Sequence, residues 1–354
     1  MGPIGENKQY NPGAPDLYFQ NDGRGGFADR TEAAGFRLEQ PLCSYGCVWS
    51  DVTGDGWPDL LVANDLEPAN LFVNQGNGLF REEGVARGFA LNAEGKPTSG
   101  MAHVVEDIDD DGDFDVLRTN FDMEPNSLFL NDGKGNFVER AGVFGLAEAS
   151  FDKLGWDAAF LDADRDGHLE LVVANGHVYP QAEKIGLHPW LQTTQLFAGE
   201  AHLSYGTVWK DATAEAGPGF APLRSARGIA VADPDDDGDP DLLIVDLDGP
   251  PRFLRNDSPK RGHWLGLELI GKQSNRDALG ARVELRSGDK TWTREVRATS
   301  GLYSSRDRRL LFGLGERKTI DSITVRWPSG SVQVEKEIPL DRYHKLVEHV
   351  EGAR

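Results

Sequence analysis

One acidic nine-residue pattern occurs four times in this chain, and it restricts the possible folds more than any other feature. The pattern is D-x-[D/T]-x-D-G-x-x-[D/E], at residues 51–59, 107–115, 162–170 and 233–241. Carboxylates stand at positions 1, 5 and 9 of every copy, and a glycine always stands at position 6. Oxygen ligands at alternate positions, with a glycine where the chain turns sharply, are typical of a loop that binds calcium.

These acidic loops are therefore predicted to bind about four Ca²⁺ ions as structural parts of a β repeat. Side chains at positions 1, 3, 5 and 9 would bind through oxygen, and position 7 would offer its backbone carbonyl. The alternative is an ordinary acidic turn, but several carboxylates in one loop without a cation would have raised pKa values and would strain the fold. Four copies in register favour the cation. The predicted metal-binding residues are Asp51, Thr53, Asp55, Trp57, Asp59, Asp107, Asp109, Asp111, Asp113, Asp115, Asp162, Asp164, Asp166, His168, Glu170, Asp233, Asp235, Asp237, Asp239 and Asp241.

The loops are not EF-hands, because an EF-hand loop ends with a bidentate glutamate at position 12 and lies between helices. Position 12 is occupied here by Val62, Arg118, Val173 and Ile244, none of which ligates through its side chain. The flanking runs are short, apolar and largely β-branched, which is typical of strands. Each loop is therefore expected to link two strands.

A second repeated unit lies between the acidic loops. Residues 16–27, 70–80 and 126–137 share a strand, a glycine-containing hairpin turn and another strand, and residues 195–206 are a degenerate copy. One period of 55, 56 or 71 residues thus holds roughly four strands, which is the content of one β-propeller blade. The fold class predicted is all-β, a calcium-binding β-propeller followed by a small β-sandwich.

The second domain is indicated by a change of composition after residues 256–262, where the acidic loops stop and basic residues increase. Stretches such as 263–270 and 281–286 alternate apolar and polar residues, as half-exposed strands do. About six to eight short strands in this region predict a small β-sandwich. Residues 340–350 are expected to form a last strand or a short helix. We place the propeller at residues 1–258 and the second domain at residues 259–354.

The net charge of the chain argues against some classes of binding partner. The formal net charge is −21, and four bound Ca²⁺ ions would bring it to −13. Such a surface repels nucleic acid and anionic lipid, so neither is expected as a partner. No run of about twenty apolar residues is present, which predicts no membrane span.

The expected location is secreted or periplasmic, because millimolar calcium would fill loops of modest affinity. The first residues do not have the layout of a signal peptide. Cys43 and Cys47 do not form a C-x-x-C motif, and both a local disulfide and two thiols are compatible with their spacing.

The repeats and the second domain together resemble a known family. The acidic loops, with the L-[F/Y]-x-N-x-G-x-G-x-F units between them, resemble the FG-GAP/VCBS repeats of integrin-like β-propellers over about residues 14–256. Residues 274–283, 300–306, 311–315 and 325–330 resemble the ASPIC/UnbV domain. This combination, including Asn175-Gly-His177, is similar to the cartilage acidic protein family and its bacterial relatives. The resemblance implies an extracellular calcium-binding protein, and it implies no reaction.

The number of blades differs from that of the integrin-type propellers, which have seven. Here four loops follow one N-terminal half-repeat that lacks a loop. One expectation is a small propeller closed by strands from both ends, in which the strands within residues 16–31 complete the blade that begins with the fourth loop. The other is that N-terminal blades are missing.

The main functional hypothesis is a binding or adhesion scaffold, because no catalytic motif is present. The sequence has no G-x-S-x-G elbow, no H-E-x-x-H and no phosphate-cradling glycine loop. Calcium would stiffen the blades, and the propeller loops with the second domain would bind a protein or a glycan. The sequence gives no indication of the oligomeric state.

The alternative is an enzyme that acts on a glycan or a secondary metabolite in a pocket at one end of the propeller. His103, His177 or His188 would then be the acid or base, and the last two lie with Trp190 in the longest interval between loops. This hypothesis requires a histidine in a deep pocket, hydrogen-bonded to a carboxylate that is not a metal ligand.

The ASPIC/UnbV-like stretches also contain paired charges. Arg276, Asp277, Arg306 and Asp307 are expected to form either an ion-pair network that fixes two loops or a polar ligand site.

Overall fold

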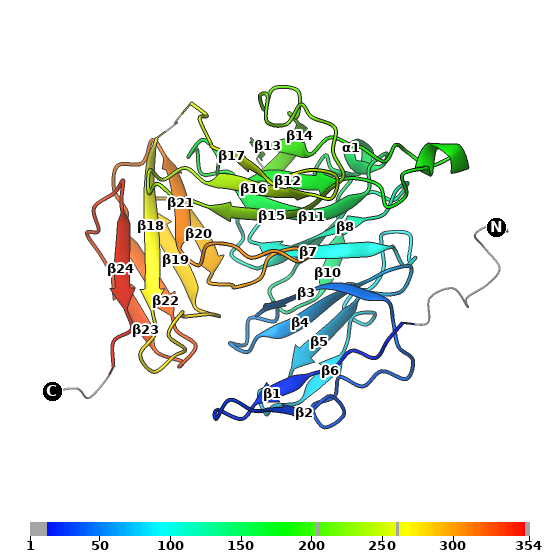
Figure 1. Ribbon diagram of the computed structural model, residues 1–354. Helices are drawn as coiled ribbons and strands as arrows, with labels where there is room; N and C mark the ends of the chain where they lie inside the picture. Colours follow the sequence, from blue (N-terminus) through cyan, green and yellow to red (C-terminus); the bar gives the residue numbers. More distant parts are fainter. Residues whose placement is uncertain (1–12, 203–205, 260–261, 351–354) are drawn as a thin grey trace.

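The computed structural model describes residues 13–202, 206–259 and 262–350, and these residues form an almost entirely β protein. Figure 1 shows a row of antiparallel sheets that begins with the β1–β2 hairpin, and a second group of strands, β18 to β24, along one side of that row. The all-β prediction is confirmed.

Three of the sheets are four-stranded blades, in which each strand pairs antiparallel with the next. A fourth sheet has only the first three strands of this pattern. In every blade the acidic loop joins the first strand to the second, as expected. Blade 1 contains β3 (Ser44–Ser50), β4 (Asp59–Asn64), β5 (Asn70–Asn74) and β6 (Phe80–Glu82), and blade 2 contains β7 (Gly100–Glu106), β8 (Asp115–Asn120), β9 (Ser127–Asn131) and β10 (Phe137–Glu139). Blade 3 contains β11 (Gly155–Leu161), β12 (Glu170–Asn175), β13 (Gln195–His202) and β14 (Gly206–Asp211), and blade 4 contains β15 (Ala226–Ala232), β16 (Asp241–Asp246) and β17 (Arg252–Leu254).

The blades pack face to face with their first strands side by side, as propeller blades do. Successive residues of a strand point to opposite faces, so each second strand contributes to two cores. In blade 3, Val173 packs toward blade 2 while Val172 packs toward blade 4. Leu117 of blade 2 packs toward blade 3 in the same way. The continuous apolar runs after the acidic loops are therefore explained by burial on both faces.

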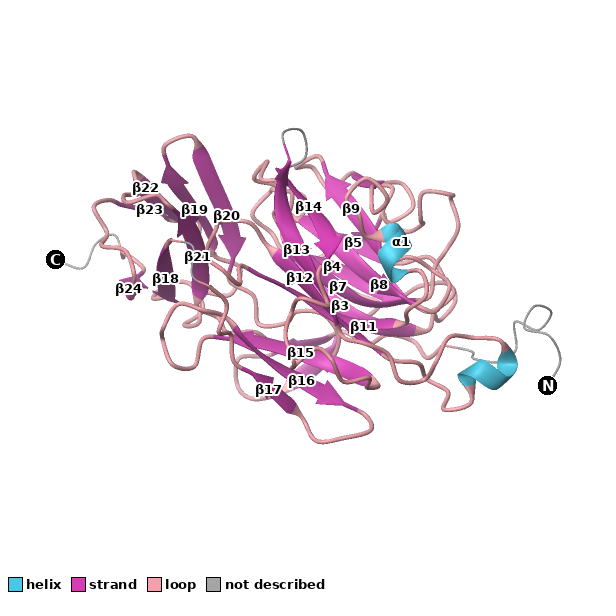
Figure 2. Ribbon diagram, turned by 90° about the horizontal axis from the view of Figure 1, so that it is seen from above, coloured by secondary structure: helices cyan, strands magenta, loops and turns pink. Residues whose placement is uncertain are grey.

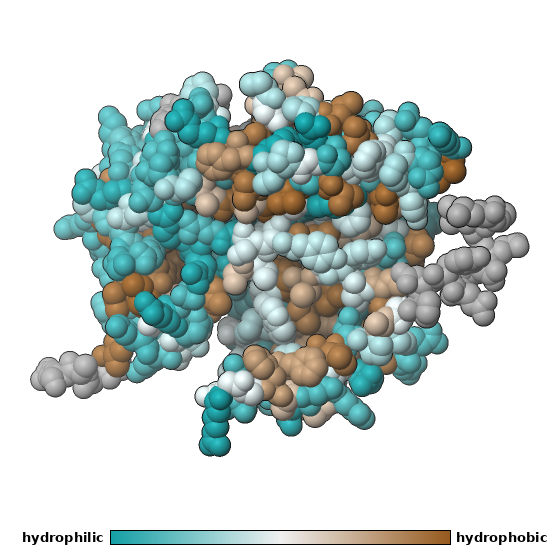
Figure 3. Space-filling model, in the orientation of Figure 1, coloured by the Kyte–Doolittle hydropathy of each residue, from teal (hydrophilic) through white to brown (hydrophobic). Residues whose placement is uncertain are grey.

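The two ends of the row do not meet, which corrects one expectation. Among the strands that the structure describes, β1 (Phe19–Asn21) and β2 (Phe27–Asp29) pair with each other alone and lie at the opposite end of the row from β17. The hairpin therefore does not complete blade 4. Its apolar residues reach the surface, visible as brown atoms at the bottom of Figure 3. The reason for the error is that a repeat pattern predicts strand content but not which edge a strand pairs with.

The second domain is a sandwich of two sheets, as predicted, and Figure 2 shows them as a layer beside the blades. Both sheets contribute to one apolar core, in which Leu267, Val283, Trp292, Phe312 and Val325 are all buried. The last segment is a strand, parallel to the first strand of the domain. One sheet has the order β21 (Leu310–Gly315), β18 (His263–Ile270) and β24 (Tyr343–Val347), and the other β20 (Lys290–Glu295), β19 (Arg282–Ser287), β22 (Ser322–Arg326) and β23 (Val332–Glu335).

The helices are short. They are α1 (Ala147–Ser150) and the 3₁₀ helix η1 (Ala182–Ile185). Within the described residues, none of the helices has the length and apolar character needed to cross a membrane. Cys43 and Cys47 are thiols in this structure rather than a disulfide.

Candidate functional site

The four acidic loops have the same backbone conformation. Position 4 is left-handed in each, at Gly54, Asp110, Arg165 and Asp236, with φ between 58° and 71°. The glycine at position 6 is also left-handed in each, with φ between 87° and 94°. A left-handed aspartate or arginine is unusual, so its recurrence at one position marks a common loop geometry.

Two recurring hydrogen bonds turn the carboxylates at positions 1 and 5 into the loop. The position-6 glycine N–H donates to the position-1 carboxylate, at 2.8 to 3.2 Å. The position-7 N–H donates to the position-5 carboxylate, at 2.8 to 2.9 Å. These bonds use some of the lone pairs, and the remaining oxygens converge on the same space.

In three loops the carboxylates at positions 1, 3 and 5 form a compact group. One ligand oxygen from each lies within 4.8 Å of the others in the sets Asp107–Asp109–Asp111, Asp162–Asp164–Asp166 and Asp233–Asp235–Asp237. The first loop has only two carboxylates at these positions, because position 3 is Thr53.

Several buried oxygens of these loops have no hydrogen-bond partner among the described residues. They include Thr53 Oγ1, Asp109 Oδ1 and Asp162 Oδ1. A buried oxygen without a donor is costly, and a cation would satisfy it. Three or more hard oxygen ligands in one loop match the preferences of calcium. The loop residues therefore fit the predicted ion.

The position-9 carboxylates accept hydrogen bonds from backbone N–H groups of their own blades. Asp59 accepts the N–H of Val52 at 3.2 Å and that of Asn74, on the third strand, at 2.9 Å. Asp115 and Glu170 bond the equivalent groups of their own blades. In the fourth loop position 2 is Pro234, which has no N–H to donate, and Asp241 accepts the N–H of Asn256 at 2.7 Å. This role was not predicted, because it depends on the neighbouring hairpin.

The position-7 side chains contact other groups, which is consistent with a ligand role for the carbonyl alone. His168 Nδ1 lies 3.1 Å from Thr207 Oγ1. Asp239 forms an ion pair of 2.6 Å with Arg165 of the preceding loop. Trp57 is half exposed, and Asp113 is partly exposed.

Without a cation the carboxyl groups of the acidic loops have raised pKa values. Burial raises the pKa of Asp107 and of Asp162 to about 7. Burial and then the Asp162 carboxylate raise the pKa of Glu170 to about 8. Burial also raises the pKa of Asp109 to about 6, with a further contribution from Asp111. Such shifts are the response of crowded, desolvated carboxylates.

The second domain sits directly on the acidic loops of blades 2 to 4, which the sequence did not reveal. Lys290 pairs with Asp110, and Arg282 donates to the carbonyl of Gly112. Trp292 Nε1 donates to the carbonyl of Gly167 at 3.3 Å. In the fourth loop Arg309 pairs with Asp236, and Tyr343 Oη donates to Asp233 at 2.8 Å.

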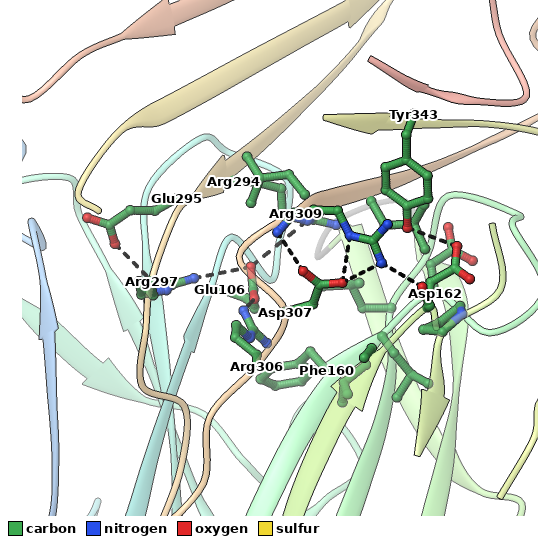
Figure 4. A pocket seen from close by; sticks show the side chains of 18 residues that line it. Glu106, Phe160, Asp162, Arg294, Glu295, Arg297, Arg306, Asp307, Arg309 and Tyr343 are labelled. Carbon is green, nitrogen blue, oxygen red and sulfur yellow. Dashed lines mark hydrogen bonds and ion pairs between the residues drawn. The ribbon is translucent and has the colours of Figure 1, made fainter. Parts of the chain in front are cut away.

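A cavity between the domains holds a network of arginines and carboxylates, drawn in Figure 4. Glu106, at the end of β7, pairs with Arg306 and lies 3.4 Å from Arg297. Arg297 reaches Glu295 at the same distance, and Asp307 pairs with Arg309 at 2.7 Å. The arginines are thus neutralised by carboxylates from both domains, and this network joins the domains.

Comparison with known proteins matches the two regions separately. The FG-GAP-like repeat family matches residues 51–118 and 107–173. The ASPIC and UnbV family matches residues 271–353. The chain is an FG-GAP-repeat protein with a C-terminal ASPIC and UnbV domain. The finer assignment to the cartilage acidic protein family stays a prediction. No curated protein matches the chain.

Solved structures resemble this FG-GAP/ASPIC protein only distantly. A lectin of Agrocybe aegerita that specifically recognises non-reducing terminal N-acetylglucosamine has 17% identity and a TM-score of 0.36 over 68% of this chain. The biofilm matrix protein Bap1 of V. cholerae has 15% identity and a TM-score of 0.32 over 85% of this chain. The FG-GAP/ASPIC protein covers 60% of each of these two chains.

One ASPIC/UnbV-like stretch runs along the first strands of the blades. The Gly301 N–H donates to the carbonyl of His103 on β7, at 3.1 Å. The Leu302 N–H donates to Asp157 on β11, at 2.8 Å, and the Leu302 side chain is fully buried. The Asp307 N–H donates to the carbonyl of Val231 on β15. This segment of the ASPIC domain therefore crosses three blades.

Three of the four charged residues singled out in the ASPIC/UnbV-like stretches form ion pairs. This agrees with the expectation of an ion-pair network. Asp277 pairs with Arg308 within the second domain. Arg306 and Asp307 belong to the interdomain network.

The histidines of the enzyme hypothesis all contact other residues of the fold. His103 is fully buried and accepts a hydrogen bond of 3.0 Å from Arg118. His188 Nδ1 lies 2.5 Å from Asp122 Oδ1, and the backbone N–H of His188 donates to the same carboxylate. His177 is fully buried, with Nε2 3.8 Å from Asp122. The histidine–carboxylate pair that the hypothesis required is present at Asp122, but the pair fastens the loop after β12 to blade 2.

Proposed function

We propose that this protein is a calcium-dependent binding scaffold, in which Ca²⁺ ions in the acidic loops hold the blades and the ASPIC domain in one rigid arrangement. The observation that carries the proposal is the position of the ASPIC domain directly on three of the four loops. An ion in these loops would fix the backbone at Asp110, Gly112, Gly167 and Asp236, to which the second domain is bonded. Calcium would therefore stabilise both the blades and the contact between the domains.

The residues that would hold the ions are those of positions 1, 3, 5 and 9, with the carbonyl of position 7. The buried oxygens without donors and the raised carboxyl pKa values support a missing positive charge at these places. A location outside the cell or in the periplasm agrees with this dependence, because calcium is abundant there. A partner would bind at the ends of the blades that the ASPIC domain leaves uncovered.

Thermal unfolding in calcium and in EDTA tests the proposal. A ligand that binds only the folded state stabilises it by mass action, and at a hundred times its Kd each ion would add about 2.7 kcal/mol. We expect the unfolding midpoint to fall by many degrees in EDTA and to recover when calcium is added. Magnesium serves as the control ion, because it prefers stricter octahedral geometry. An equal midpoint in calcium and EDTA would contradict the proposal.

A further inference from the structure

Three exposed tyrosines lie at the ends of the blades opposite the acidic loops. Tyr45 lies near the start of β3, Tyr179 follows β12, and Tyr303 belongs to the ASPIC segment that crosses the blades. They are 36%, 46% and 81% exposed. Exposed aromatic rings at one place on a protein are unusual, because their burial is favourable.

Tyr303 is held outward by a dedicated set of buried contacts. Its φ is 56°, a conformation that is strained for a bulky residue. Both neighbours are fixed to Asp157, through the Leu302 N–H at 2.8 Å and through the Ser304 hydroxyl. Asp157 is fully buried and accepts a further bond from the Ile229 N–H at 2.7 Å. Buried hydrogen bonds on both sides therefore hold the Tyr303 backbone in a strained conformation, with the ring exposed to solvent.

Tyr179 is held by the loop that contains the Asn-Gly-His sequence. Its N–H donates to His177 Nδ1 at 3.1 Å, and the two rings lie 5.6 Å apart. Arg227 donates to the carbonyls of Gly176 and His177 and stacks over Trp156 at 4.2 Å. These contacts fix the loop, so the ring of Tyr179 projects from a rigid base.

Tyr45 completes the group. Its ring lies 6.3 Å from that of Trp156, the same tryptophan that Arg227 covers. Leu302, next to Tyr303, belongs to one apolar cluster with Trp156. The phenols of Tyr303 and Tyr179 are close enough to contribute to the raised pKa of Tyr45, after burial and the Asp65 carboxylate. The strand with Tyr45, the loop with Tyr179 and the segment with Tyr303 therefore all contact Trp156 or its immediate neighbours.

From this arrangement we infer that the tyrosine group is a binding site for neutral glycans, which deepens the proposed function and rests on it. Fixed aromatic rings stack on the apolar C–H faces of sugar rings, and phenol hydroxyls bond sugar hydroxyls. Tyrosine provides both kinds of contact with little loss of side-chain entropy. The exposed aliphatic residues at this end, such as Leu66 and Leu247, stand on separate loops, which is normal for a protein surface.

The charges near the group favour a neutral ligand. Asp65 is close to Tyr45, and Glu124 is close to Asp65. Arg227 keeps its positive charge, because its partners are neutral backbone carbonyls. Asp65, Glu124 and Asp122 outnumber this guanidinium, so the excess charge of these described groups is negative and would disfavour sulfated or uronic-acid chains.

Glycan binding by the calcium-loaded full chain tests the inference. The probes are neutral oligosaccharides built from glucose, xylose, mannose or N-acetylglucosamine, with sulfated chains for comparison. We expect at least one neutral series to bind in isothermal titration and to show saturation transfer from the tyrosine protons. Tyr303→Ala should weaken this binding at least tenfold, and Tyr179→Ala should weaken it as well.

The control variant is Phe253→Ala, which removes an exposed aromatic ring of blade 4 that is 57% exposed and lies outside the group. It should bind the same glycan as the original chain. The inference is overturned if no neutral glycan binds at millimolar concentration, if Tyr303→Ala binds unchanged, or if these tyrosines bind a protein instead. Unfolding in EDTA is measured separately, so a calcium-dependent protein that binds no glycan would disprove this inference and leave the scaffold intact.

Discussion

Two sets of buried carboxylates in this protein differ in what surrounds them. In the acidic loops they face one another, and burial raises the pKa of Asp162, for example, to about 7. In the ASPIC domain Glu348 is equally buried but is surrounded by donors. It accepts the N–H groups of Lys272, Gln273 and Ser274 at 2.6 to 2.8 Å. We propose a bound cation for the first set, whereas hydrogen-bond donors of the domain itself surround Glu348.

Glu348 should make the ASPIC domain sensitive to acid. Burial alone would raise its pKa, but hydrogen bonds from Ser329, Lys272 and Ser274 lower it to about 2. A lowered pKa means that the stabilisation is present above the unfolded value, near 4.5, and is lost as the pH falls toward 2. We expect Glu348→Gln to cost about 2 kcal/mol at neutral pH.

Chemical unfolding of both proteins from pH 7 to pH 2 measures this effect. The difference in unfolding free energy between the original chain and Glu348→Gln should shrink as the pH falls below 4.5. The acidic loops are common to both proteins, so their titration cancels in the difference. A difference that stays constant with pH would show that the charge of Glu348 does not stabilise the domain.

At the scale of the element, the same strand position has different surroundings along the row of blades. Leu117 on β8 and Leu243 on β16 both lie two residues after the last carboxylate of their acidic loops. Leu117 is fully buried against the next blade, whereas Leu243 is 42% exposed on the outer face of blade 4. Whether a leucine at this position is buried therefore depends on the presence of a neighbouring blade and not on the position in the repeat.

This pair gives a matched prediction. Leu117→Ala should cost about 3 kcal/mol, because it opens a cavity between two blades. Leu243→Ala should change the stability by no more than about 0.5 kcal/mol, as at other surface positions. Denaturant unfolding of the two variants in calcium measures both values. Equal losses would mean that the outer face of blade 4 is covered in solution.

The strands and loops of the blades could be predicted from the sequence because their signals are local. A glycine at position 6 and alternating carboxylates determine the loop, and the β-branched runs after Asp59 or Asp241 determine the strand. The pairing of the β1–β2 hairpin could not be predicted, because it depends on contacts between distant segments. For the same reason Asp157, which anchors Leu302, gave no signal in the sequence.

For the whole molecule, the decisive feature is the contact between the ASPIC domain and the ends of the blades. Glu106 lies at its centre and faces Arg306, Arg297 and Arg294 from the second domain. Two of the pairs that join the domains, Lys290 with Asp110 and Arg309 with Asp236, involve residues of the acidic loops themselves. Loss of order in the loops would therefore be transmitted to the domain interface.

Removal of Glu106 should weaken this interface. Glu106→Ala removes the carboxylate that pairs with Arg306 and leaves Arg297 with Glu295 alone, and breaking a buried ion pair typically costs about 3 to 5 kcal/mol. Glu94→Ala is the control, because its pair with Lys96 is exposed and should contribute nothing measurable. Calorimetry and limited proteolysis between the domains would show whether they separate. Equal behaviour of the two variants would remove Glu106 from the account of the interface.

The most direct test of the calcium loops is a count of bound ions. Chain stripped of metal and dialysed against calcium should bind about four ions, as the common backbone of four loops predicts. Asp109→Ala, which removes a buried oxygen of the second loop, should bind one fewer and leave the other loops filled. A stripped chain that binds no calcium, or a variant with an unchanged count, would contradict the account.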